Sequence, residues 1–87
     1  MSEFRKQKRQ LVKKIHSLNS ESAVESFLDT ILTDREMEEI VHRLQIIKLL
    51  KKGVSQREIV AKLGVGIATV TRGSKALKSG KFDKLIF

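Results

Sequence analysis

Several residue types that stabilise small proteins are missing from this chain of 87 residues. It has no cysteine, so no disulfide crosslinks it, and His16 and His42 are too far apart in the sequence to suggest a shared metal site. Proline and tryptophan are also missing, and aromatic residues make up only 5%. Because one domain this short buries a modest fraction of its surface, oligomerisation is the remaining common means of stabilisation.

Long apolar runs and catalytic constellations are missing as well. The first residues, Met1 to Lys6, lack the apolar run of a signal peptide, and no stretch is apolar enough to span a bilayer. We find no nucleophile with a paired base, no carboxylate pair in an apolar setting and no phosphate loop. We therefore expect a cytoplasmic protein that is not an enzyme, with no membrane partner, metal or prosthetic group.

Positive charge is abundant and unevenly placed. The formal net charge is +8. Residues 1–32 contribute +2 and residues 33–53 contribute +1, whereas residues 54–87 hold seven basic and two acidic groups, a net of +5. This segregation indicates a polyanionic partner for the C-terminal part of the chain, with a generic basic surface as the alternative.

Apolar residues recur at three and four positions along the whole chain, which predicts an all-helical single domain over residues 1–87. Dimerisation helices are expected over about 3–52, the first of them over about 3–18. This first helix is amphipathic and basic, so it could lie on a membrane surface. We favour dimerisation, because its apolar side is aliphatic and lacks tryptophan. The apolar stripe consists of Phe4, Leu11, Val12, Ile15 and Leu18.

Two capping boxes predict where the second and third helices begin. Ser22 and Glu25 form the first of these boxes, and Thr33 and Glu36 form the second. Gly53 is expected to end the long third helix. Because the apolar stripes exceed what one small domain can cover, we expect an intertwined homodimer.

A helix-turn-helix is predicted over about residues 55–77. Ser55 and Glu58 form a capping box, and Gly64 supplies the left-handed conformation that ends the first helix of the motif. The inward positions have the spacing that locks two helices at a steep angle. They are Ile59, Leu63, Val65 and Val70. An ordinary helical hairpin is the alternative. The capping box, the turn glycine and the inward residues together favour the helix-turn-helix.

The outward surface of the motif carries small, polar and basic groups, which suit the major groove of double-stranded DNA. The residues expected to face base edges are Ile67, Ala68, Thr69 and Thr71. Those expected mainly to meet phosphates are Gln56, Arg57, Ser74, Lys75 and Lys78, and Gly66 completes the DNA-binding set. A short C-terminal helix is expected over about 81–87.

Gly73 lies inside the second helix of the motif, where glycine costs about 1 kcal/mol relative to alanine. It permits either close packing of another helix or the approach of a ligand to the backbone. The sequence physics alone favours packing.

Several segments resemble the tryptophan repressor family. They are Ile67–Ser74, Ser55–Glu58 and Leu32–Thr33, the last together with Arg43, ten residues after Thr33. The likeness covers roughly residues 32–78. It implies a Trp repressor-like helical fold, an intertwined homodimer and L-tryptophan as a small-molecule corepressor.

The resemblance also implies a ligand site. Two arginines of this family sandwich the indole ring, and here they are Arg43 and Arg72. Arg72 and the Thr33 hydroxyl meet the ligand carboxylate, while Gly73 forms the floor. Ala76 departs from the family, which places a serine hydroxyl there near the ligand amino group.

Three functions remain open on the sequence. The first is a transcriptional repressor that uses L-tryptophan to bind a palindromic operator as a dimer. The second is a ligand-independent DNA-binding regulator of the same fold, to which Ala76 points. The third is a protein-interaction module whose basic helices dock an acidic partner.

Overall fold

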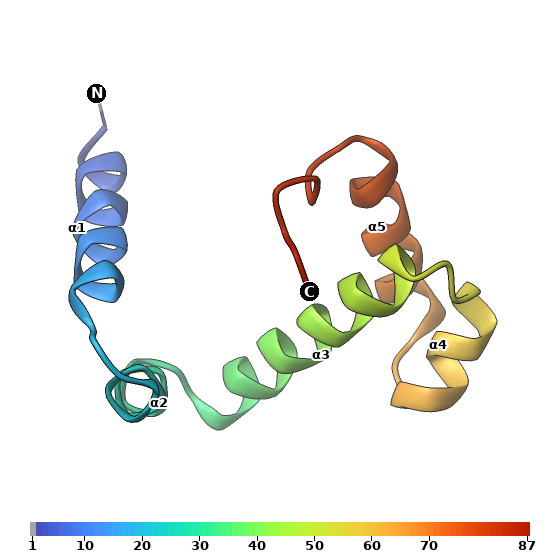
Figure 1. The fold of residues 1–87 in the computed structure, drawn as a ribbon, viewed down its shortest axis with the longest axis horizontal. Helices are drawn as coiled ribbons and strands as arrows, with labels where there is room; N and C mark the ends of the chain where they lie inside the picture. Colours follow the sequence, from blue (N-terminus) through green and yellow to red (C-terminus); the bar gives the residue numbers. More distant parts are fainter. Residues whose placement is uncertain (1) are drawn as a thin grey trace. The chain divides into compact units, whose positions relative to one another are not determined.

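The computed structural model describes residues 2–87, which form five α-helices and no strand. The all-α class predicted from the apolar periodicity is therefore confirmed. Within the described range, no helix is both long enough and apolar enough to cross a membrane. In chain order the helices are α1 (Glu3–Ser17), α2 (Glu21–Ile31), α3 (Asp34–Lys51), α4 (Gln56–Leu63) and α5 (Ile67–Lys78), as Figure 1 shows.

The chain divides into two compact units, Met1–Met37 and Glu38–Phe87. Helix α3 begins in the first unit and continues into the second. That the whole chain acts as a single domain stays a prediction.

Serine hydroxyls begin the first two helices. The Ser2 hydroxyl accepts from the Arg5 amide at 3.2 Å, and the Ser20 hydroxyl accepts from the Ala23 amide at 3.0 Å. The predicted cap at Ser22 is therefore wrong, because α2 begins two residues earlier. The earlier start lengthens the helix and puts Glu21 in its first turn, where a negative charge is favourable.

The capping box predicted at the start of α3 is confirmed. The Thr33 amide donates to Glu36 Oε1 at 2.9 Å, and the Glu36 amide donates to Thr33 Oγ1 at 3.1 Å. The first of these bonds, supported by the Thr33 side chain, holds the pKa of Glu36 below its ordinary value of 4.5. Two amides that the helix leaves without partners are thereby satisfied reciprocally.

The described part of the first unit, residues 2–37, has an exposed apolar surface and no buried residue. Neither α1 nor α2 contains a buried residue. Phe4 is 73% exposed, and the stripe on α1 continues through Leu11, Val12 and Ile15, all of them exposed. The predicted stripe therefore exists, but no core forms over it within this unit.

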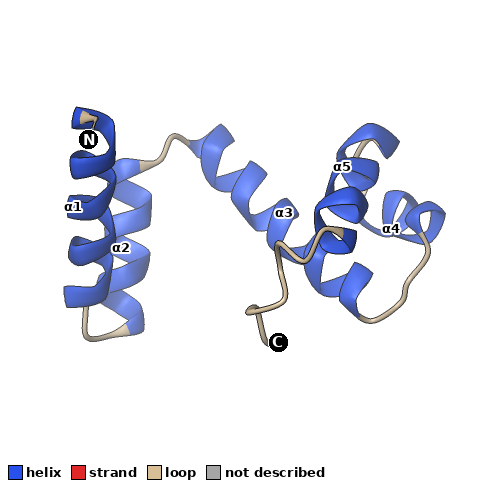
Figure 2. Ribbon diagram, turned by 90° about the horizontal axis from the view of Figure 1, so that it is seen from above, coloured by secondary structure: helices blue, strands red, loops and turns tan. Residues whose placement is uncertain are grey.

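The core lies in the second unit, where three helices meet (Figure 2). Ile46 of α3 is 2% exposed, and Ile59 of α4 and Val70 of α5 are 0% exposed. The predicted inward positions at Ile59 and Val70 are thus confirmed. Partly buried side chains surround this trio: Leu49, Leu50, Val54, Val60, Leu63 and Val65.

The C-terminal segment forms turns, so the short helix predicted over 81–87 is wrong. Gly80 adopts a left-handed conformation with φ +84°, and the Lys81 amide bonds back to the Ala76 carbonyl, which ends α5. The Lys51 ammonium donates to the carbonyls of Phe82 and Leu85. Because this side chain binds the carbonyls from outside the segment, the tail is held without a helix of its own.

The buried trio generates the first prediction. We expect Ile59→Ala to lower the free energy of unfolding by about 2–5 kcal/mol, because it removes side-chain volume from a fully buried site. Ile67→Ala is the matched control, since Ile67 is 54% exposed and its loss is expected to change stability by about 0.5 kcal/mol or less. Denaturant unfolding followed by circular dichroism measures both, and equal losses would contradict the assigned core.

Candidate nucleic-acid interface

Local hydrogen bonds shape the helix-turn-helix as the sequence predicted. The Glu58 amide donates to the Ser55 hydroxyl at 3.2 Å, so Ser55 caps α4. Gly64 ends α4 with φ +66°, in the left-handed region that favours glycine. Gly66 then precedes α5 and offers its first turn no side-chain cap. The beginning of α5 is therefore open to an acceptor from outside the chain.

A side-chain hydrogen bond joins the two helices of the motif. Thr71 Oγ1 donates to Gln56 Oε1 at 2.9 Å in a partly buried setting. Both residues were predicted to contact DNA, which stays a prediction, and the bond links them to each other. The Gln56 amide nitrogen and the Thr71 lone pairs keep capacity for further bonds. The pair therefore holds α4 against α5 at the surface that the sequence assigns to DNA.

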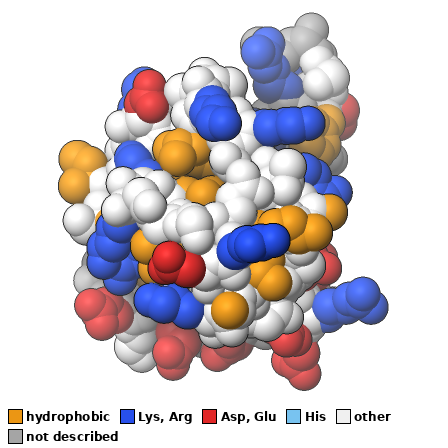
Figure 3. All heavy atoms as spheres, turned by 90° about the vertical axis from the view of Figure 1, so that its right-hand side faces the viewer, with side chains coloured by type: hydrophobic (Ala, Val, Ile, Leu, Met, Phe, Trp, Pro, Cys, Tyr) orange, Lys and Arg blue, Asp and Glu red, His pale blue; other side chains and the backbone are white. Residues whose placement is uncertain are grey.

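The remaining predicted DNA contacts differ in accessibility. Thr69 is half-buried, and Ser74 is only 8% exposed, which disfavours the phosphate contact expected of its hydroxyl. Figure 3 views the molecule from the side of α4 and α5, where lysine and arginine side chains stand around small and apolar groups. The exposed members of the set are Arg57, Gly66, Ile67, Ala68, Lys75 and Lys78.

Gly73 is a point of close packing between α5 and α3. A Cβ atom added at Gly73 would lie 3.2 Å from Ile46 Cγ2 and 3.3 Å from Leu50 Cδ1. These distances are shorter than ordinary van der Waals contact, so a side chain at this position would require the side chains of Ile46 and Leu50 to give by a few tenths of an ångström. Of the two explanations that the sequence left open for this glycine, helix packing is therefore the one supported by the geometry.

The predicted ligand residues belong to both units. Arg43 and Arg72 are exposed side chains of the second unit. Arg43 lies one helical turn before Ile46 on α3, and Arg72 directly precedes Gly73 on α5. Thr33 belongs to the first unit, where its hydroxyl oxygen accepts the helix-capping bond and keeps its proton to donate elsewhere. The joint role of these residues stays a prediction.

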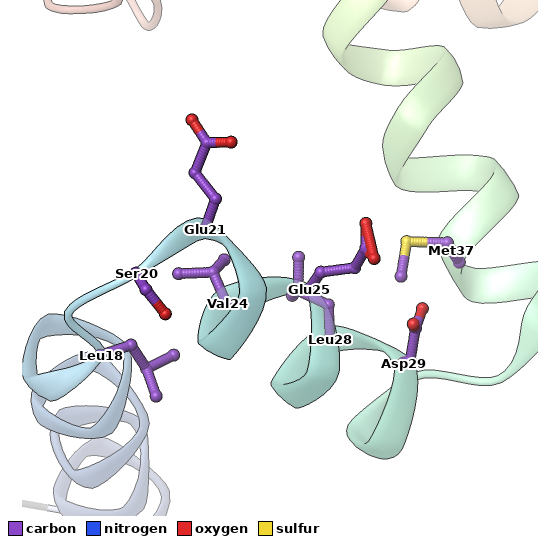
Figure 4. Close-up of a pocket in the computed structure, with 8 residues that line it drawn as sticks. All are labelled: Leu18, Ser20, Glu21, Val24, Glu25, Leu28, Asp29 and Met37. Atoms are coloured by element: carbon purple, nitrogen blue, oxygen red, sulfur yellow. The ribbon is translucent and has the colours of Figure 1, made fainter.

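A groove in the first unit was not among the sequence predictions. It has a volume of ≈640 Å³, and Figure 4 shows its lining residues on α2, on the segment before α2 and at Met37. The signal in the sequence was the spacing of Glu21, Glu25 and Asp29, which recurs every four residues and places acidic groups along one side of α2. The apolar lining residues are Leu18, Val24, Leu28 and Met37.

Comparison with known proteins identifies the family. The chain matches the family model of the Trp repressor protein over residues 6–85. It is 45% identical over 71 residues to the Trp operon repressor homolog of Vibrio campbellii, a match that covers 80% of this chain and 71% of that protein. The Trp operon repressor homolog of Xylella fastidiosa is 39% identical over 77 residues, covering 87% and 84%. No solved structure gives a significant match.

The match runs from α1 to the C-terminal tail and so covers both units and the whole helix-turn-helix. The family is one of transcriptional repressors and not of enzymes. A resemblance noted on short segments thus extends over nearly the entire sequence, and the chain belongs to the Trp repressor family of transcriptional regulators.

Proposed function

We propose that this protein is a sequence-specific DNA-binding repressor that acts as a homodimer on a palindromic operator, with L-tryptophan as corepressor. The helix-turn-helix carries the proposal. Its inner side is closed by Ile59 and Val70, while Ile67, Ala68 and Lys75 stay exposed on α5. A rigid helix with small outward groups and basic neighbours suits the major groove, where base edges differ in their donors and acceptors.

The excess of positive charge supports the same partner. Residues 54–87 carry a net charge of +5, and Arg57, Lys75 and Lys78 are exposed there. Lysine and arginine that neutralise phosphates release counterions, which supplies sequence-independent affinity for DNA. The uncapped start of α5 adds a favourable position for a phosphate.

The homodimer is supported by apolar surface that one chain does not cover. The stripe on α1 is exposed, and Ile40, Val41 and Leu44 on α3 are 44%, 48% and 47% exposed. Contiguous apolar patches of this kind mark interaction sites on soluble proteins. A second copy would bury them, and a dimer also matches the two half-sites of a palindrome.

A ligand-independent regulator of the same fold is the second candidate. Two observations favour it. Ala76 has no hydroxyl to offer an amino group, and the space beside Gly73 is taken up by Ile46 and Leu50. The cytoplasmic location expected from the sequence stays a prediction under either function.

We predict that the protein sediments as a dimer at micromolar concentration. Replacing Leu11 and Ile15 together by asparagine is expected to raise the dimer dissociation constant at least tenfold, because each buried side chain of this size contributes about 1.5–3 kcal/mol. Ile67→Asn is the matched control, since Ile67 is similarly exposed but lies on α5. Analytical ultracentrifugation measures all three proteins. A folded wild-type monomer at this concentration would contradict the proposal.

Binding to bases and binding to phosphates are expected to respond differently to substitution. Lys78→Ala should weaken binding to every duplex and reduce the slope of log affinity against log salt by about one unit, because one phosphate is no longer neutralised. Thr69→Ala should instead change the preferred sequence, by roughly 1–3 kcal/mol at the contacted step. Fluorescence anisotropy with a randomised set of short duplexes separates the two effects. A sequence-independent decrease in affinity from both variants would refute the proposed orientation of α5.

The corepressor is testable without a label, because the chain has no tryptophan of its own. We expect the fluorescence of added L-tryptophan to change on binding, and Arg72→Gln to remove that change. Ala76→Ser is expected to strengthen tryptophan binding, because its hydroxyl offers an acceptor to the ammonium group. Arg57→Gln is the control, because Arg57 is exposed on α4 and outside the predicted ligand site. DNA and tryptophan should tighten each other's binding by the same factor. Operator binding that is equally tight without tryptophan would favour the ligand-independent regulator.

A further inference from the structure

Helix α1 carries a second positively charged surface, remote in sequence from the helix-turn-helix. The helix contains six lysine and arginine residues and one acidic residue, Glu3. Every residue of α1 is exposed. The charge is therefore concentrated on a helix whose basic side chains no other element covers.

The positions of these charges along the helix place four of them on one face. Arg5, Arg9 and Lys13 follow each other at intervals of four residues, and Lys6 lies beside them. At about 1.5 Å of rise per residue, the row extends over about 12 Å. We call Arg5, Lys6, Arg9 and Lys13 the basic row. Together with Gln10, its side chains line a hollow of ≈450 Å³.

Most of the basic row points away from the apolar stripe of the same helix. At 100° per residue, positions 6, 9 and 13 lie roughly opposite positions 4, 11 and 15, whereas Arg5 borders Val12 of the stripe. If the apolar stripe is buried against a second copy, as proposed above, Lys6, Arg9 and Lys13 stay in solvent. No ion pair within residues 2–87 neutralises the basic row.

We propose that the basic row is an accessory phosphate-binding surface for duplex DNA, which adds sequence-independent affinity to the contacts of α5. The duplex presents one negative charge for about every 1.7 Å of its axis, so a row about 12 Å long meets several phosphates. Arginine and lysine are the side chains that bind phosphate oxygens, and no aromatic side chain interrupts the row. Its role is to raise affinity for any duplex, and not to select a sequence.

An anionic membrane is the other polyanion to consider, and the geometry favours DNA. An amphipathic helix on a membrane needs its apolar face in the lipid as well as its charges at the headgroups. On α1 the apolar face is the one assigned to the dimer. Only the charged face is left for a further partner, and a charged face alone fits a polyphosphate backbone.

The inference rests on the proposed binding of DNA, and a pair of matched variants tests it. Arg9→Gln/Lys13→Gln removes two charges from the basic row. Lys8→Gln/Lys14→Gln removes two charges from the same helix at other positions, Lys8 within the apolar stripe between Ile15 and Val12, and Lys14 at the edge of the stripe. We expect the first variant to weaken binding to a long duplex of unrelated sequence. Its slope of log affinity against log salt is expected to fall by about one unit for each phosphate that it no longer neutralises. The second variant is expected to leave this slope unchanged. Circular dichroism checks that both keep their helix content.

The outcomes separate this inference from the proposed function. If the wild-type protein binds duplexes through Lys78 and Thr69 but both double variants keep its salt slope, or lower it equally, the basic row is not a phosphate surface. If Lys78→Ala and Thr69→Ala have no effect while Arg9→Gln/Lys13→Gln weakens binding, the basic row stands and the role of α5 fails. Binding to anionic phospholipid vesicles that Arg9→Gln/Lys13→Gln abolishes, with an unchanged DNA salt slope, would also overturn the inference.

Discussion

The contact of Ile46, Ile59 and Val70 is the interaction on which the second unit depends. These side chains come from α3, α4 and α5 and are 0–2% exposed. Because none of residues 2–37, the described part of the first unit, is buried, this small core is what orients the helix-turn-helix. Interiors at native packing density transmit displacements, so a shift of α3 would move α5 with it. Any regulation of the proposed DNA-binding surface from α3 would therefore pass through this contact.

Gly73 allows α3 and α5 to pack closely. Its missing Cβ allows Ile46 and Leu50 of α3 to approach α5 closely, at a position where glycine otherwise destabilises a helix. Arg43 and Arg72 lie within one helical turn, along the chain, of residues in the same contact. A ligand held by these arginines would lie against the α3–α5 junction, and this gives the proposed corepressor a physical route to the orientation of α5. The same tightness limits the space beside Gly73, which is why the ligand-independent regulator remains the alternative.

The two units use their surfaces differently. The second unit has a core, and its basic residues border the outward face of α5. The first unit has an uncovered apolar stripe on α1, a groove with acidic groups along α2, and the basic row on another side of α1. A small chain without cysteine can gain stability by burying such apolar surface against a second copy. Dimerisation would then bury the apolar stripe of the first unit and leave its charged surfaces accessible to other partners.

The sequence by itself determined the five helices, most of their caps and the inward positions of the helix-turn-helix, because these follow from contacts within about four residues. It did not single out Ile46 as a core residue. Ser55, Thr33 and Gly64 act as local chemistry requires. Tertiary structure decided the features that depend on distant atoms. The bond from Thr71 to Gln56 joins residues 15 apart, and Lys51 holds a tail more than 30 residues away in the form of turns. Local periodicity contains no information about such partners, since they meet only once the helices have packed.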